Sequence, residues 1–118
     1  MSYIDGFLVP VPDGNKEAYR TMAAKAAPIF IEHGALRVVE AWDDDIKTGK
    51  TNDFRTAIIA EEGEKVVFSW IEWPSKAFRD VGMQKVMVDE RMKPDGDLPF
   101  SGPRMIYGGF ATIIDEAA

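Results

Sequence analysis

Apolar and polar positions along the first third of this chain change from the period of a strand to that of a helix. Tyr3–Val11 is apolar on both faces except at Asp5, as expected of an inner strand covered on both sides. A helix is predicted from about Asn15 to Gly34, which is a natural C-terminal stop. Its apolar positions form one stripe at helical spacing: Tyr19, Met22, Ala23, Ala26 and Phe30. This part of the chain therefore predicts a strand followed by a helix.

The middle of the chain begins the same pattern again. A second strand is predicted at Ala35–Asp43, and the polar stretch Asp44–Thr56 is typical of a long loop. A third strand, Val66–Trp73, stops at Pro74 and gives way to a helix through Ser75. The chain thus contains a second strand–helix unit.

The second predicted helix is apolar on two sides and ends at Pro94–Asp97. One side carries a stripe of four residues: Phe78, Val81, Val88 and Met92. Met83 and Met87 lie on nearly the opposite side, so this helix has two surfaces to bury. Arg104–Asp115 is predicted as the last strand, in which two glycines, Gly108-Gly109, indicate a bulge or a close approach.

This order of elements predicts one α+β domain over residues 1–118. It has a ferredoxin-like βαββαβ order, with a four-stranded antiparallel sheet and two helices on one face. The second and third strands carry apolar side chains on both sides: Leu36, Val38, Trp42, Val67, Ile71 and Trp73 alternate with Val39, Ala41, Phe68 and Trp70. Two helices cover only one face, so we expect a second copy of the chain to cover the other, in a homodimer.

Composition narrows the classes of function. The 118 residues are 46% hydrophobic and 29% charged, which is typical of a globular domain. A net charge of −6 argues against nucleic-acid binding, because an acidic surface repels phosphates. With no cysteine and one histidine, we expect no disulfide, thiol nucleophile or metal site. The chain shows neither a signal peptide nor an apolar run that could cross a membrane, which predicts a cytoplasmic protein without a membrane partner.

Polar residues interrupt the two middle strands. In an antiparallel pairing, Arg37 is expected opposite Glu72, and Glu40 opposite Ser69. Together with Trp70, these residues are the candidate ligand-binding set, because an arginine and carboxylates beside an indole could orient an anionic or aromatic ligand. The structural alternative is a cross-strand ion pair that fixes the register, and paired strand charges more often have that role.

Three residues are candidates for catalysis: Asp5, His33 and Glu72. A desolvated carboxylate at Asp5 could act as a general base, although hydrogen bonds to backbone donors would explain it equally well. His33 is the only side chain that ordinarily titrates near neutral pH. Its place just before Gly34 favours an electrostatic role at a helix C-terminus.

Five longer blocks of the chain resemble one family: Tyr3–Phe7, Lys25–Phe30, Gly34–Glu40, Phe68–Lys76 and Gly82–Met87. Over nearly its whole length the chain resembles the YbaA-like family of uncharacterised bacterial proteins, the domain of unknown function 1428, within the dimeric α/β-barrel superfamily. The resemblance implies that fold and a homodimer. The superfamily includes cofactor-free oxygenases, isomerases, decarboxylating enzymes and haem-degrading proteins, so the fold alone implies no single reaction.

The residues and the resemblance together indicate a homodimeric protein that binds a small organic molecule between its sheet and its helices. The alternative is a cofactor-free monooxygenase or isomerase that acts on a small, for example aromatic, compound. We expect no cofactor, since haem needs an axial ligand and only His33 offers an imidazole.

Overall fold

The structure is a computed structural model that describes residues 1–118. Four strands, three α-helices and two 3₁₀ helices follow one another along the chain. Their bounds are β1 Tyr3–Pro12, η1 Asp13–Asn15, α1 Lys16–Glu32, β2 Arg37–Trp42, α2 Phe54–Ala57, β3 Glu64–Trp73, α3 Lys76–Met87, η2 Glu90–Met92 and β4 Ile106–Ala111. The chain is therefore an α+β protein, as predicted.

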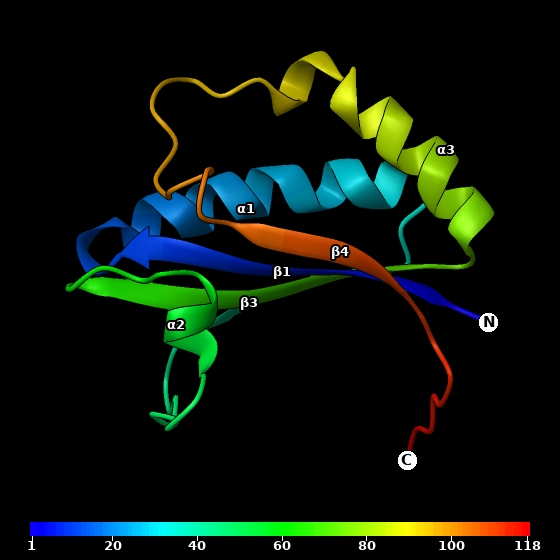
Figure 1. Ribbon diagram of the computed structural model, residues 1–118. Coiled ribbons are helices and arrows are strands. Elements are labelled where there is room, and N and C mark those ends of the chain that lie inside the picture. Colours follow the sequence, from blue (N-terminus) through cyan, green and yellow to red (C-terminus); the bar gives the residue numbers. More distant parts are fainter.

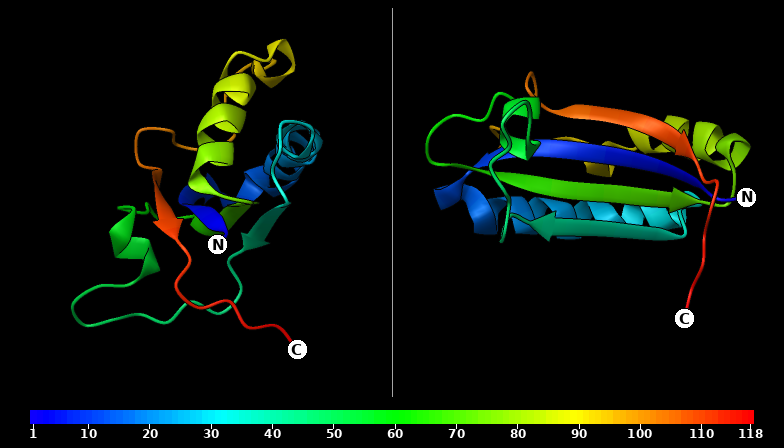
Figure 2. Two further views of the ribbon diagram at one scale, coloured as in Figure 1. Left: turned by 90° about the vertical axis from the view of Figure 1, so that its right-hand side faces the viewer. Right: turned by 60° about the horizontal axis from the view of Figure 1, so that its bottom comes forward.

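The four strands form one antiparallel sheet in the order β2-β3-β1-β4. The N-terminal strand is one of the two central strands, and its Tyr3 pairs with Trp73 on one side and Ala111 on the other. Helices α1 and α3 lie on the same face of the sheet, while the short α2 lies beyond the opposite face (Figures 1 and 2). The second face has no long helix over it.

Residues that alternate along the strands form the core beneath α1 and α3, because successive side chains point to opposite faces. Near one end of the sheet, Val9, Val11 and Val67 pack with Tyr19 of α1. Near the other end, Ile71 and Trp73 pack with Ala35, with Phe30 and Met83 against them. The apolar stripe predicted for α1 faces this core: Tyr19 is buried, and Met22, Ala23, Ala26 and Phe30 are partly buried.

The apolar stripe predicted for the second long helix is wrong. Ser75 caps α3 as predicted, its Oγ accepting a hydrogen bond from the Phe78 amide at 3.2 Å. However, α3 ends at Met87, and its buried residues are Gly82 and Val86, whereas Phe78 and Val81 are exposed. A methyl group on Gly82 would overlap the Trp73 ring, so this glycine is what lets α3 lie close to the sheet.

Apolar side chains of the second sheet face are left open to solvent. Only 16 of the 118 residues are buried, so much apolar surface has no cover within one chain. On this face Phe68 is 45% exposed, Ile106 45% and Phe110 62%. The α2 residue Phe54 packs edge-on against Phe68 with ring centroids 6.0 Å apart and covers only part of it. We call this surface the open face.

Two connections differ from simple loops. The end of the predicted loop Asp44–Thr56 is part of α2, Phe54–Ala57. This helix begins with a capping box in which Asp53 accepts a hydrogen bond from the Thr56 amide at 2.8 Å. The connection from α3 to β4 passes beside α1 (Figure 1). Arg104 fixes its end by donating two hydrogen bonds, of 2.6 and 2.7 Å, to the Glu64 carboxylate at the start of β3. This connection closes one side of a cavity.

Candidate functional site

A cavity of about 710 Å³ lies between α1, the sheet and the connection from α3 to β4. We call it the α1 pocket. Its lining is mostly apolar: Phe7, Val9, Met22, Ala23, Phe30, Val38, Ile71, Met87, Met92, Phe100 and Met105 are among the 27 lining residues. Charged residues of α1 and of the connection also line it, among them Lys25 and Asp95, whose Nζ and Oδ2 atoms are 3.4 Å apart. A cavity of this size and character suits a small organic molecule.

Glu40, Tyr19 and Ser69 form the polar part of the α1 pocket. The Tyr19 hydroxyl donates to Oε1 of Glu40 at 2.7 Å, and the Ser69 hydroxyl donates to Oε2 at 2.9 Å. Tyr19 and Ser69 are buried. Glu40 is exposed as a whole residue, because β2 is an edge strand, but its carboxylate is held against α1 and β3 by these two donors.

Burial shifts the acid–base behaviour of two of these groups. Desolvation raises the pKa of the Glu40 carboxyl, and the hydrogen bonds from Tyr19 and Ser69 only partly oppose that shift. The pKa of Tyr19 is raised as well, by desolvation and then by the negative charge of Glu40. Raised pKa values make a neutral Tyr19 donor and a more basic Glu40 carboxylate, an arrangement suited to accepting a proton or a hydrogen bond.

Asp5 lies outside the α1 pocket, in a buried cluster at the other end of the same sheet face. Its Oδ2 accepts a hydrogen bond from the Trp73 indole at 3.0 Å, and Nε of Arg79 lies 3.7 Å from its Oδ1. Desolvation raises the pKa of Asp5, while the positive charge of Arg79 lowers it. Arg79 also donates to the Tyr3 hydroxyl at 2.9 Å. These side-chain contacts, rather than backbone donors, hold the Asp5 carboxylate.

Gly109 explains how the Asp5 cluster fits beside β4. It pairs with Asp5 in a continuous register, so the two glycines of β4 produce no bulge. A methyl group on Gly109 would overlap Tyr3 and lie 2.5 Å from Arg79. Of the two sequence-based alternatives for these glycines, close approach is confirmed.

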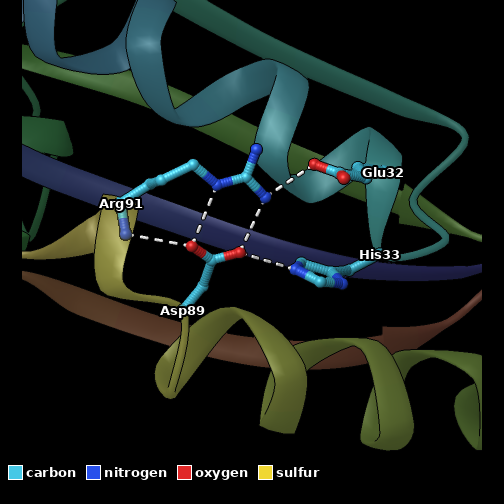
Figure 3. Close-up of polar contacts among 4 residues, drawn as sticks. All are labelled: Glu32, His33, Asp89 and Arg91. Carbon is cyan, nitrogen blue, oxygen red and sulfur yellow. Dashed lines mark hydrogen bonds and ion pairs between the residues drawn. The ribbon is translucent and has the colours of Figure 1, made fainter.

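His33 caps α1 and belongs to a polar cluster that joins the ends of α1 and α3 (Figure 3). Its Nε2 lies 2.8 Å from Oδ2 of Asp89. Arg91 donates to both oxygens of Asp89, at 3.0 and 2.8 Å, and to Glu32 at 2.6 Å. Hydrogen bonds from Arg91, and then from His33, lower the pKa of Asp89. His33 is thus engaged at the helix C-terminus, and it does not line the α1 pocket.

Arg37, Trp70 and Glu72 lie on the opposite side of the sheet from Glu40 and Ser69. The predicted register is confirmed, with Arg37 opposite Glu72 and Glu40 opposite Ser69. Glu72 accepts a hydrogen bond from the Trp70 indole at 3.1 Å, but its carboxylate has no basic group within 4.0 Å, and Arg37 is exposed. The buried Arg37–Glu72 ion pair considered from the sequence is therefore not formed within one chain.

The candidate ligand-binding residues therefore fall into two groups. Glu40 and Ser69 share the α1 pocket, and the other three share the open face. Sequence reasoning placed Tyr19 only in the core and missed its hydrogen bond to Glu40, because nothing in a helical stripe shows which of its members carries a polar partner. Four of the six methionines, Met22, Met87, Met92 and Met105, line the pocket, and nothing in their spacing along the chain indicates that grouping.

No three histidine, aspartate or glutamate side chains converge as a metal site would require. None of the helices combines the length and the apolar character needed to cross a bilayer.

These features define a small α+β protein with a mostly apolar pocket beneath its first helix. The chain belongs to the family described as "Protein of unknown function (DUF1428)", whose model matches residues 2–102. It is similar to the "Uncharacterized protein YbaA" of Escherichia coli strain K12, at 62% identity over 117 residues, which covers 98% of this chain and 100% of that protein. The proteins of the same description from Escherichia coli O157:H7 and Shigella flexneri match to the same extent.

Proposed function

We propose that the protein is a homodimer that binds a small organic molecule in the α1 pocket. The cavity of about 710 Å³, in which two hydroxyl groups hold the Glu40 carboxylate beside mostly apolar walls, is the observation that supports binding. Pockets of this type, apolar with a few convergent polar groups, are the usual ligand sites of small proteins. The ligand would reach Glu40 from the cavity side of the sheet.

The ferredoxin-like fold and the dimeric α/β-barrel are part of the same proposal. The strand order β2-β3-β1-β4, with α1 and α3 on one face, supports the ferredoxin-like arrangement. The open face supports the dimer, because exposed Phe68, Ile106 and Phe110 need an apolar cover. Packing the open faces of two copies against each other would supply it. A cytoplasmic location stays a prediction.

A thermal-shift screen of small organic compounds tests the binding. A ligand that binds only the folded state stabilises it and so raises the melting temperature. The stabilisation is about 2.7 kcal/mol when the ligand concentration is one hundred times its Kd. We expect some compounds to bind. Ala26→Leu places a larger side chain in the pocket lining and should lower the affinity for these compounds at least about tenfold. Ala77→Leu, on the exposed start of α3, is the matched control. The proposal would be contradicted if no compound bound, or if the compounds bound to Ala26→Leu as tightly as to the wild type.

A second candidate is a cofactor-free monooxygenase or isomerase. The observation that favours it is the Glu40 carboxylate, whose raised pKa and neighbouring Tyr19 hydroxyl suit proton abstraction from a bound compound. Hits from the screen are incubated with the protein in air, without added metal or flavin, and followed for products and oxygen uptake. Turnover that Glu40→Gln removes would establish an enzyme, and binding without turnover would leave a binding protein.

A further inference from the structure

The Glu40 carboxylate lines the α1 pocket beside its apolar walls, and it has no positive partner. None of the basic side chains lies within 4.0 Å of its oxygens, and its two hydrogen bonds come from neutral hydroxyl groups. The nearby basic residues of α1 are engaged elsewhere: Lys16 lies over the Trp42 ring at 5.4 Å, and Arg20 lies 3.6 Å from Glu17. A partly buried carboxylate without a cation is costly, and a cation in the pocket would relieve that cost.

The Glu40 carboxylate also has room for more hydrogen bonds. An ionised carboxylate offers about four acceptor sites on its two oxygens. Tyr19 and Ser69 use one site on each oxygen. A ligand that donates hydrogen bonds can therefore be added without displacing either hydroxyl group.

The rest of the α1 pocket determines the body of such a ligand. Its walls are mostly apolar, with Met22, Met92 and Met105 among Phe7, Phe30 and Phe100. Methionine side chains adapt to ligands of different shape and make favourable contacts with aromatic rings. A hydrocarbon or aromatic part of a ligand would fill the cavity and make apolar contacts with these walls. The charged lining residues, among them Lys25 and Asp95, lie on α1 and on the connection after α3.

We propose that the α1 pocket takes a small apolar amine, whose ammonium group donates hydrogen bonds to the Glu40 carboxylate while its hydrocarbon part lies among the methionine and aromatic side chains. This inference rests on the proposed ligand-binding function and names the ligand class. An organic acid of the same size would be repelled at Glu40, because both carboxylates carry a negative charge. The raised pKa of Glu40 supports the same reading, since a cation is what would stabilise the ionised form.

The test compares three polar ends on the same apolar bodies. Amine, alcohol and carboxylate forms of hexyl, phenylethyl and naphthylethyl compounds are titrated into the full chain by calorimetry at pH 7.5. For at least one body, we expect the amine to bind about tenfold or more tighter than the alcohol, as a hydrogen bond to a charged group allows, and the carboxylate not to bind. In Glu40→Gln the amine and the alcohol should bind within about twofold of each other. Glu62→Gln changes the same charge on an exposed loop residue and should keep the wild-type preference.

A second variant keeps the inference testable if Glu40→Gln does not fold. Ser69→Ala retains the carboxylate and removes one of the two hydrogen bonds that already stabilise its negative charge, so the amine should bind more tightly while the alcohol changes little. Alcohols or carboxylates that bind as well as the amines would overturn the amine inference and leave the binding function standing. The absence of binding by all nine compounds would overturn both. An amine preference that survives Glu40→Gln would show that another group recognises the ammonium.

Discussion

Gly82 shows how a single residue can set the distance between a helix and a sheet. On helix propensity alone, Gly82→Ala would stabilise α3 by about 1 kcal/mol. The added methyl group would instead overlap the Trp73 ring and lie 2.6 Å from the carbonyl oxygen of His33. Neither neighbour can rotate away, because Trp73 is fully buried and the other atom is backbone. The overlap therefore outweighs the propensity.

We expect Gly82→Ala to lower the free energy of unfolding by about 1–3 kcal/mol, as overpacked cores do. Urea denaturation followed by tryptophan fluorescence measures the change. Gly14→Ala is the matched control, because an added methyl group at Gly14 would meet nothing within 4 Å. A Gly82→Ala protein that is as stable as the wild type would show that α3 is free to move away from the sheet.

Glu40 gives the stability of the protein a pH dependence of unusual sign for a carboxylate. Its pKa is raised in the folded state, so this state binds the proton more tightly than the unfolded chain does. The contribution of Glu40 to stability is therefore present below the pKa of the unfolded chain and is lost as the pH rises through the folded pKa. As the pH increases through this range, we expect the free energy of unfolding of Glu40→Gln to increase relative to that of the wild type. Denaturation of both proteins from pH 4 to 8 measures it, and parallel curves would contradict the raised pKa.

At the scale of elements, the cluster around Asp89 joins the end of α1 to the end of α3. The chain leaves α3 here for the connection that closes the α1 pocket. The pKa of Asp89 is lowered, so its contribution to stability is present above the unfolded carboxyl pKa of about 3.9 and is lost as the pH falls. The sign is the reverse of that at Glu40.

We expect Asp89→Asn to melt at a lower temperature than the wild type at pH 7, because Arg91 and His33 lose their common acceptor. The difference should shrink as the pH falls below about 4, where this carboxylate is protonated in the unfolded wild-type chain but stays ionised in the folded one. Thermal melts at pH 7, 5, 4 and 3 follow this change. Glu90→Gln serves as the control, since its exposed pair with Lys93 should contribute little. An equal difference at every pH would mean that charge plays no part.

Local pattern was enough to predict the four strands, since an apolar run that stops at Pro74 marks β3, and an assumed antiparallel pairing gave the register of β2 with β3. The two-residue period of a strand also separates Arg37 from Glu40 and Ser69 from Glu72, since residues three apart on a strand face opposite sides. Their division into two sites was thus readable from the sequence once the register was accepted. The buried side of α3 could not be predicted from the sequence, because Gly82, which lies against the sheet, has no hydrophobic side chain to mark it. The α1 pocket could not be predicted either, since its size depends on the distance between α1 and the connection before β4.

At the scale of the whole molecule, the open face predicts that two copies of the chain associate as a dimer. Sedimentation velocity at low micromolar concentration should show a dimer. Phe68→Glu should weaken it at least about tenfold, because a charge would be buried against apolar surface. The same change at Val81, which is 54% exposed on the helix-covered side, is the control and should leave the dimer intact. A folded wild-type monomer under these conditions would remove the basis for the barrel.

The place of β1 in the sheet has a consequence for synthesis. Tyr3 is translated more than a hundred residues before its partner Ala111 on β4. Pairing between such distant segments slows folding, and until β4 arrives one edge of β1 presents unpaired amide and carbonyl groups. A ribosome that stalls before Ile106 would release a three-stranded sheet with that edge bare. Such truncated chains are expected to aggregate through strand addition, so the last strand protects the first against self-association.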